Sequence, residues 1–199
     1  MDNSVGDIYI KEMVEKAVEY FGIKKSVEKR EVCPEGLMDE GSIKCCIKNI
    51  ARKLGLDINV KLLYVEDSYF SSKSLVWKNG ETFDTVGITA QVLMPERLPF
   101  FGSSELANFP IEVAIAKNSQ QEEYSFITIM VHELSHVLLK SLMQDEWSNE
   151  FYTDITAIVL GFLEIMEYGR KRSVFSGCSK VDITYGYLND SQFVFVKKE

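Results

Sequence analysis

The amino-acid sequence predicts a single α+β domain, because the hydrophobic pattern changes its period twice along the 199 residues. Apolar residues recur at helical spacing in the first part of the chain, alternate in short runs after it, and then return to helical spacing. Helices and strands grouped in this way are typical of α+β proteins with a mostly antiparallel sheet. We therefore expect one domain, residues 1–199, in which a small, mostly antiparallel sheet packs on two long helices.

The N-terminal part, residues 1–57, is expected to be helical. Residues 8–22 and residues 42–54 each place apolar side chains on one face of a helix. Gly22 and Gly55 stand at the ends of these runs, and glycine commonly ends a helix because it adopts a left-handed conformation without strain. We expect two amphipathic helices before the sheet.

The sheet region, residues 58–117, contains several short runs typical of strands. Hydrophobic residues alternate over 58–65, within "DINVKLLYVED", and again in "PIEVAIAKN". The intervening "KSLVWKNGETFDTVGITAQVLMP" indicates further strands, with a hairpin turn at the Asn79-Gly80 pair. The aromatic-rich segment "LPFFGSSELANF" either lines a cleft or is buried, and we favour burial in the core.

Helical spacing returns over residues 123–168. Residues 123–142 carry one apolar stripe and residues 148–168 carry another, which predicts two long helices in succession. Ala157 and Gly161 fall on the face of the second helix that is expected to meet the first. Their small size predicts close packing of the two helices.

Composition and charge narrow the function classes. The net charge of −8 disfavours a nucleic-acid partner, whose phosphates the negative field would repel. No window approaches the roughly 18 apolar residues of a membrane span, and the N-terminus lacks the basic start of a secretory signal. We expect a cytoplasmic protein with neither nucleic acid nor membrane as its partner.

The four cysteines agree with a reducing compartment. They form no Cys-x-x-Cys pair, so they predict neither a zinc ribbon nor a redox motif. Cys45 and Cys46 are adjacent in an expected helix, and buried free thiols are the simplest interpretation. A contact between Cys33 and Cys178 stays open.

The only two histidines of the chain lie in one expected helix, in "SFITIMVHELSHVLLKSL". His132 and His136 are four residues apart, so their rings share one face about 6 Å apart along the axis. At that spacing two imidazole nitrogens can reach one metal ion, and Glu133 can take a proton from a metal-bound water. Because these polar groups in an apolar helix cost free energy unless they are satisfied, the pattern favours a zinc site over a buried histidine pair.

A catalytic zinc ion takes three protein ligands and keeps one position open, so the third ligand here must be a carboxylate or a thiolate. The segment "NEFYTD" supplies Glu150 and Asp154, four residues apart on one face of the next helix. Glu150 can complete the metal site, and Asp154 can accept the free ring N–H of either histidine. Asp145 and Glu146 are the competing ligands, nearer in sequence and less well patterned.

The two motifs together resemble those of the gluzincin metallopeptidases, which carry His-Glu-x-x-His on one helix and Asn-Glu-x-x-x-Asp on the next. The match covers "HELSH" and "NEFYTD" in residues 132–154. The resemblance implies a zincin-like fold. It also implies an edge strand before the active-site helix that pairs with an extended substrate, and "PIEVAIAKN" is in the expected position for this strand. It also implies roles for five residues: zinc bound by His132, His136 and Glu150, Glu133 as general base, and Asp154 supporting His132.

The function that the resemblance implies is zinc-dependent hydrolysis of peptide bonds, with a peptide or protein as substrate. The first 100 residues match no part of the family pattern, and this sequence contains no segment like the large helical domain of bigger members. The substrate cleft is then either open or closed by residues 1–57. The alternative is a zinc-binding regulatory or interaction module with little peptidase activity, and the sequence predicts no oligomeric state.

The C-terminal tail, residues 173–199, contains "ITYGYLNDSQFVFV", which predicts a turn followed by a short helix. The chain has no further histidine that could stabilise an oxyanion. Tyr185 is our candidate for that role, with Tyr187 and Arg170 as alternatives, because a hydroxyl or a guanidinium can donate to a developing negative charge.

Overall fold

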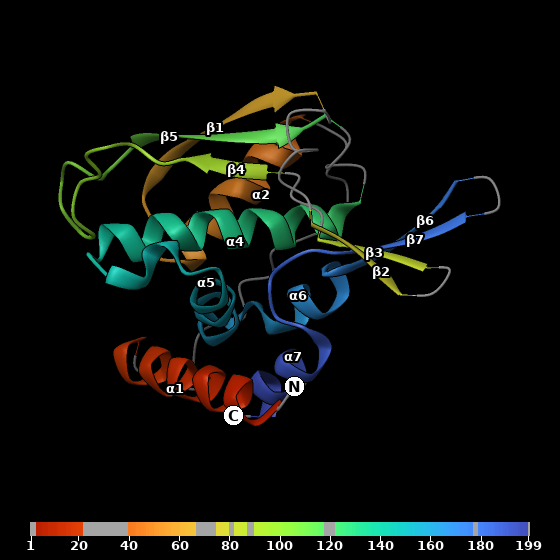
Figure 1. Ribbon diagram of the computed structural model, residues 1–199. Coiled ribbons are helices and arrows are strands. Elements are labelled where there is room, and N and C mark those ends of the chain that lie inside the picture. The colour runs from red at the N-terminus through yellow and green to blue at the C-terminus, as the bar shows by residue number, and fades with distance from the viewer. Residues whose placement is uncertain are drawn as a thin grey trace.

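Figure 1 shows the computed structural model of the protein. The structure describes residues 3–21, 40–66, 75–79, 82–86, 90–117, 122–176 and 179–198. Its helical segments, which include the 3₁₀ turn η2 and the π-helical turn η3, are α1 (Asn3–Phe21), α2 (Glu40–Lys53), α4 (Glu123–Ser141), η2 (Asp145–Ser148), α5 (Glu150–Ala157), η3 (Ile158–Phe162), α6 (Leu163–Gly169) and α7 (Asp190–Lys198). Its strands are β1 (Ile58–Val65), β2 (Leu75–Asn79), β3 (Thr82–Val86), β4 (Ala90–Leu93), β5 (Phe109–Ala116), β6 (Lys171–Ser176) and β7 (Ser179–Thr184).

The α+β class is confirmed, but the strands form two mixed sheets instead of one mostly antiparallel sheet. The first sheet has the order β1-β5-β4, with β1 parallel and β4 antiparallel to β5. The second has the order β2-β3-β7-β6, in which a parallel β3–β7 pair lies between two antiparallel pairs. Parallel neighbours need long connections, and both parallel pairs join strands far apart in the sequence. Local alternation of residues cannot reveal such pairings.

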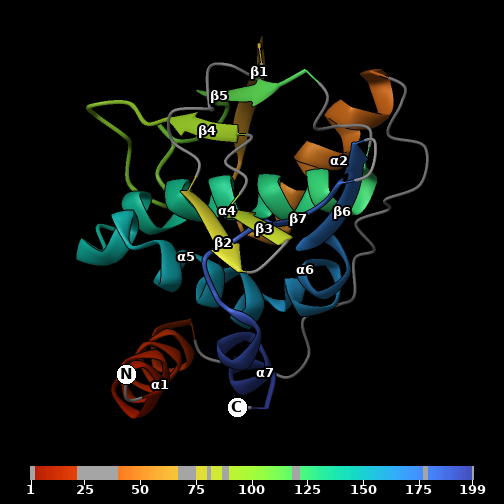
Figure 2. The same cartoon turned by 45° about the vertical axis from the view of Figure 1, so that its right-hand side comes forward.

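Helix α4 lies at the centre of the molecule (Figures 1 and 2). The first sheet and α2 lie on one side of it, and α5, α6, α1 and α7 lie on the other. Every residue from Ser125 to Leu139 is buried, so this helix has no solvent-exposed face over that length. Polar side chains within such a helix must find partners inside the protein.

The single long helix predicted over residues 148–168 is divided. Helix α5 leads into the π-helical turn η3, and α6 follows after it. Gly161 has a φ of 93° in this turn, which lies outside helical geometry. Glycine adopts such a conformation without the steric penalty of a side chain, so it is the residue at which the helix changes direction.

The close contact between α4 and the helices that follow it is made by a different glycine from the one expected. Ala157 is buried as predicted, but Gly161 is exposed, so its predicted contact with the first helix is wrong. Gly169 has that role. A Cβ atom at this position would overlap Thr128 Oγ1 and the carbonyl oxygen of Tyr124, both on α4.

The C-terminal tail contains the predicted short helix, α7, and also a β-hairpin that the sequence did not indicate. Strands β6 and β7 pair antiparallel, from Lys171 opposite Thr184 to Ser176 opposite Ser179. This hairpin completes the second sheet next to α6 (Figure 2). The hairpin is short and rich in polar residues, so its alternation is too weak to predict strands without the partner strand β3.

Other local predictions have mixed outcomes. Strand β1 has the predicted bounds, and β2 pairs antiparallel with β3, with Asn79 opposite Thr82, in agreement with the predicted hairpin. In the aromatic-rich loop, Leu106 is buried, whereas Phe100 is 62% exposed, so burial in the core holds only in part. Cys46 is buried and Cys45 is exposed, both as free thiols.

Several predictions fall on residues outside the described part of the chain: Gly22, Cys33, Gly80 and Cys178. Within the described part, the N-terminal helix ends at Phe21 and the second helix ends at Lys53, close to the predicted positions. No helix among the described residues is both long enough and apolar enough to cross a membrane.

Candidate metal centre

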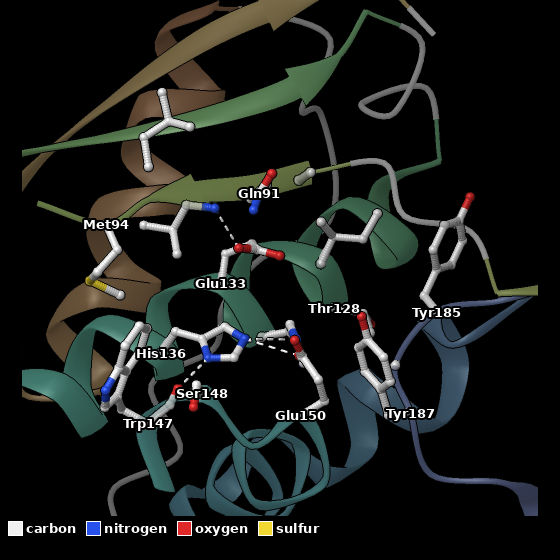
Figure 3. Close-up of a pocket in the computed structure, with 16 residues that line it drawn as sticks. Gln91, Met94, Thr128, Glu133, His136, Trp147, Ser148, Glu150, Tyr185 and Tyr187 are labelled. Atoms are coloured by element: carbon white, nitrogen blue, oxygen red, sulfur yellow. Dashed lines mark hydrogen bonds and ion pairs between the residues drawn. The ribbon is translucent and has the colours of Figure 1, made fainter. Parts of the chain in front are cut away.

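Helix α4 presents its two histidines and the intervening glutamate to one cavity (Figure 3). The ring centroids of His132 and His136 are 4.8 Å apart, and the rings are nearly perpendicular at 86°. These two residues and Glu133 are each only 8% exposed. One turn of a helix therefore places both imidazoles at the same buried wall, as the sequence spacing predicted.

Helix α5 brings Glu150 against both rings. Glu150 Oε2 lies 2.9 Å from His132 Nε2 and 3.1 Å from His136 Nε2, and the two nitrogens are 3.2 Å apart. Among the residues that the structure describes, these three form the one group of side chains with suitable chemistry and spacing to hold a metal ion. The predicted ligands thus come together in a single cluster.

The position of Glu150 depends on how α5 begins. Asn149 caps the helix, because its side-chain oxygen accepts a hydrogen bond from Tyr152 N at 3.2 Å. The amide nitrogen of the same side chain donates to the Tyr9 hydroxyl of α1 at 2.9 Å. The N-terminal helix therefore contacts the residue directly before Glu150, the third candidate ligand, a link that the sequence did not predict.

The second nitrogen of each ring is also bonded. His132 Nδ1 lies 2.7 Å from Asp154 Oδ1, and His136 Nδ1 lies 2.6 Å from the carbonyl oxygen of Trp147. Because both partners are acceptors, each Nδ1 carries a proton, and in the neutral rings each Nε2 keeps its lone pair. Both lone pairs then point toward Glu150 Oε2. Three acceptor atoms this close repel one another unless a cation or an added proton lies among them.

Asp154 is itself fixed from a distant part of the chain. It is 1% exposed, and its Oδ2 accepts hydrogen bonds from Tyr187 N at 2.6 Å and Leu188 N at 3.3 Å. Gly186, with a φ of +88°, allows the chain to approach, because a Cβ there would lie 2.9 Å from this oxygen. The sequence could not indicate these donors, since they are backbone groups of a turn that follows β7.

Glu133 turns toward the first sheet, away from the cluster of ligands. Its Oε2 accepts a hydrogen bond from Val92 N of β4 at 2.6 Å (Figure 3). Burial raises the pKa of Glu133 above its ordinary value, although the two nearby histidines oppose that shift. The carboxyl group is therefore held at the cavity wall with more affinity for a proton than an exposed glutamate has.

Electrostatics at the cluster favour positive charge at its centre. Burial lowers the pKa of His132, but Asp154 and Glu150 outweigh this effect and raise it well above its usual value. Burial raises the pKa of Glu150, yet hydrogen bonds and charge from the two histidines hold it at about 2. Both shifts arise because carboxylates surround the rings in a buried site.

The cavity has a volume of about 630 Å³ and separates the cluster from β4. Its walls come from β4, α4, the segment 147–150 and the turn 185–187. Strand β4 is at the edge of its sheet, whereas β5 is in the middle, so the predicted edge strand "PIEVAIAKN" is wrong and β4 has that position. None of the described residues of the N-terminal part lines the cavity, so α1 and α2 do not form its other wall.

The two candidate tyrosines both line the cavity but differ in their partners. The Tyr185 hydroxyl bonds to Arg172, whereas the Tyr187 ring stacks on His132, with centroids 5.6 Å apart and an angle of 23°. Burial and the nearby carboxylates raise the pKa of Tyr187, so its hydroxyl stays protonated. Arg170 is outside the cavity lining and pairs with the first residue of α7.

The competing ligands lie outside the cluster of described residues. Glu146 forms an ion pair with Lys16 of α1, and that pairing lowers its pKa. Asp145 is in the same 3₁₀ turn, before the ligand helix begins. Glu150 is therefore the carboxylate that joins the two histidines.

Comparison of the chain with models of protein families, with curated proteins and with solved structures finds no match. The resemblance to gluzincins consequently depends on two short motifs and on the geometry of the side chains that they contain. A function for this site has to be argued from its chemistry.

Proposed function

We propose that the protein is a zinc-dependent metallopeptidase of the gluzincin type. One observation carries the proposal: His132 Nε2, His136 Nε2 and Glu150 Oε2 converge at one wall of a cavity. The opposite side of each ring is held by Asp154 or by the Trp147 carbonyl. Outer partners of this kind orient metal-binding histidines and fix the tautomer whose lone pair is on the metal-facing nitrogen.

The spacing of the three atoms supports zinc as the metal. Ligands of a tetrahedral zinc ion lie about 2.0–2.2 Å from it, and therefore roughly 3.3 Å from one another. The three separations here are 2.9, 3.1 and 3.2 Å. Two imidazoles and one carboxylate are also a known donor set of catalytic zinc, which leaves a fourth position for water or substrate.

In the proposed reaction, bound zinc supplies Lewis-acid activation of water and of the scissile carbonyl. Glu133 would accept the proton of the attacking water and then deliver it to the leaving amine. The raised pKa of Glu133 supports this role, because a general base works best when its pKa approaches the working pH. Its backbone partner, Val92 N, keeps the carboxylate at the cavity wall.

An extended polypeptide is the substrate class that the other wall of the cavity supports. Strand β4 is an edge strand, and an edge strand can pair with an added extended segment. Tyr187 replaces Tyr185 as the proposed donor to the carbonyl oxygen, because Tyr187 stacks on a proposed ligand while the Tyr185 hydroxyl is bonded to Arg172.

The test combines metal content with cleavage. Elemental mass spectrometry of the purified protein should find about one zinc per chain, and Glu150→Ala should lose most of it. The wild type should release specific products from a peptide library, and Glu133→Gln should release none while keeping its zinc. A folded wild type that takes up no zinc on titration would remove the basis of the proposal.

A zinc-binding regulatory or interaction module with little peptidase activity is the second candidate. The hydrogen bond that Val92 N donates to Glu133 favours this candidate. The bond engages a carboxylate oxygen that a general base would need for the proton of the attacking water. If the module is correct, the protein binds zinc but wild type and Glu133→Gln show the same absence of cleavage. Specific products that depend on Glu133 would exclude an inert module.

A further inference from the structure

We propose that the groove between α2 and the outer edge of β1, which pairs with no other strand among the described residues, binds an extended, acidic polypeptide segment by strand addition. Strand β1 and strand β4 are the two outer strands of the first sheet, so this groove is at the opposite edge from the candidate metal centre (Figure 1). The groove has a volume of about 550 Å³ and is lined by α2, residues 56–62, Tyr64 and Asn108. The inference is independent of the proposed peptidase function.

Backbone groups of β1 point into the groove. The Asp57 carbonyl accepts a hydrogen bond from Asn108 N at 2.8 Å, so it points toward β5, and the last carbonyl of β1 does the same. Successive strand residues direct their N–H and C=O groups to opposite edges. Ile58, Val60 and Leu62 therefore present both groups to the free edge, and none of the described residues outside the sheet bonds to them.

Basic side chains line the same groove. Lys48 and Arg52 on α2 and Lys61 on β1 are exposed there, and Asp57 is the single carboxylate among the described lining residues. No ion pair joins the three basic groups to another residue in the described part of the chain. In a protein of net charge −8, this local positive charge selects an acidic partner and disfavours a basic one.

The floor of the groove is apolar. Ile43, Ile47 and Ala51 on α2 are buried and line it. Side chains of an added strand alternate between two faces, so the set on the side of α2 can meet Lys48 and Arg52 beside this floor. Exposed strand edges pair readily with extended chains. These features together fit an extended polypeptide that carries both acidic and apolar residues.

The direct test uses a fluorescent peptide of four Glu-Val repeats, with anisotropy measured in EDTA on the Glu133→Gln protein. EDTA and the substitution exclude binding through zinc and turnover at the metal centre. We expect saturable binding that weakens with added salt, and much weaker binding of the matching Lys-Val peptide. A Glu-Val peptide with alternate valines replaced by proline should also bind poorly, because proline cannot donate to a strand. Equal binding of the proline peptide would overturn strand addition.

Substitutions of basic groove residues test whether the peptide binds in this groove. Lys48→Glu with Arg52→Glu should weaken binding by about tenfold or more, because two attractive contacts become repulsive. Arg97→Glu with Lys198→Glu is the control, since both residues are exposed, outside the groove, and change the net charge equally. If the reversal affects folding, Lys48→Gln with Arg52→Gln should still weaken binding several-fold. Equal binding by the groove and control variants, or stronger binding of an eight-residue oligothymidylate, would overturn the proposal.

Discussion

The two segments that form the candidate metal-binding cluster are constructed differently. Helix α4 is unbroken and buried from Ser125 to Leu139, so the helical repeat alone sets the relative positions of its two histidines and glutamate. The second segment, residues 145–169, passes through a 3₁₀ turn, a capped helix and a π-helical turn. The position of Glu150 within it depends on contacts with the rest of the protein.

Because of this difference, substitutions in the two segments should affect two different properties: the reaction itself, and the positions of the proposed ligands. A change of one functional atom on α4 should alter the reaction and leave the cluster in place. A change in the second segment should alter how well the ligands are positioned, and therefore metal affinity or stability. The contacts of Asp154 and Asn149 show the dependence, because their partners come from the C-terminal turn and from α1.

The largest effect on turnover should come from a change of Glu133, the proposed general base on α4. On the proposed function, Glu133→Gln should reduce turnover of a cleaved peptide by about 10²–10⁴-fold, because it removes general-base catalysis. Zinc content should stay at the wild-type level, since Glu133 contacts Val92 N and not the ligand cluster. Single-turnover assays and elemental mass spectrometry on the same samples test both statements. If Glu133→Gln loses zinc as well as turnover, then Glu133 is also needed for zinc binding, and the two roles of α4 are not independent.

The next effect concerns the support of His132. Asp154→Asn removes the charge opposite Nδ1 and should lower zinc affinity by about 10–100-fold, measured by competition with a chromophoric chelator. Glu150→Ala should lower it further, because it removes a ligand. Glu164→Gln on the exposed side of α6 is the control with the same charge change. An Asp154→Asn protein with wild-type affinity would argue against the role of this aspartate.

A third prediction tests the contact between α4 and α6. Gly169→Ala should lower the free energy of unfolding by about 1–3 kcal/mol, because its Cβ would overlap the Tyr124 carbonyl and Thr128. Gly6→Ala in α1 is the matched control, with no atom within 4 Å of the new Cβ. It should raise the free energy of unfolding by about 0.5–1 kcal/mol. Urea denaturation measures both, and equal effects would contradict the packing argument.

The smallest effect should come from the cap of α5. Asn149→Ala should cost about 1 kcal/mol of stability, because Tyr152 N loses its capping acceptor. Asn149→Asp keeps that acceptor, removes the amide that donates to Tyr9 and adds a negative charge at the start of α5, where the helix dipole favours it, so it separates capping from the contact with α1. Urea denaturation with zinc removed by a chelator gives the comparison. If the aspartate variant is as unstable as the alanine variant, the α1 contact outweighs the cap.

Much of the fold could be predicted from local pattern. The bounds of β1, and within two residues those of α2 and α4, follow from the period of apolar residues, whereas α1 begins at Asn3, five residues before the predicted start. The parallel pairs, the β6–β7 hairpin and the break at Gly161 could not be predicted in this way. Those features depend on partners distant in sequence or on one backbone conformation within an otherwise helical pattern.

For the candidate site, the residue types of the proposed ligands and their spacing follow from the sequence alone. His132 and His136 share a face because four residues complete about one helical turn, and Glu150 and Asp154 repeat that spacing on the next helix. The hydrogen-bond partner of each side-chain atom, in contrast, depends on the tertiary fold. Val92 N, the Trp147 carbonyl and the Tyr187 backbone come from three separate segments. Backbone donors and acceptors are the same in every residue, so their place in the site is set by the packing of the chain and not by residue type.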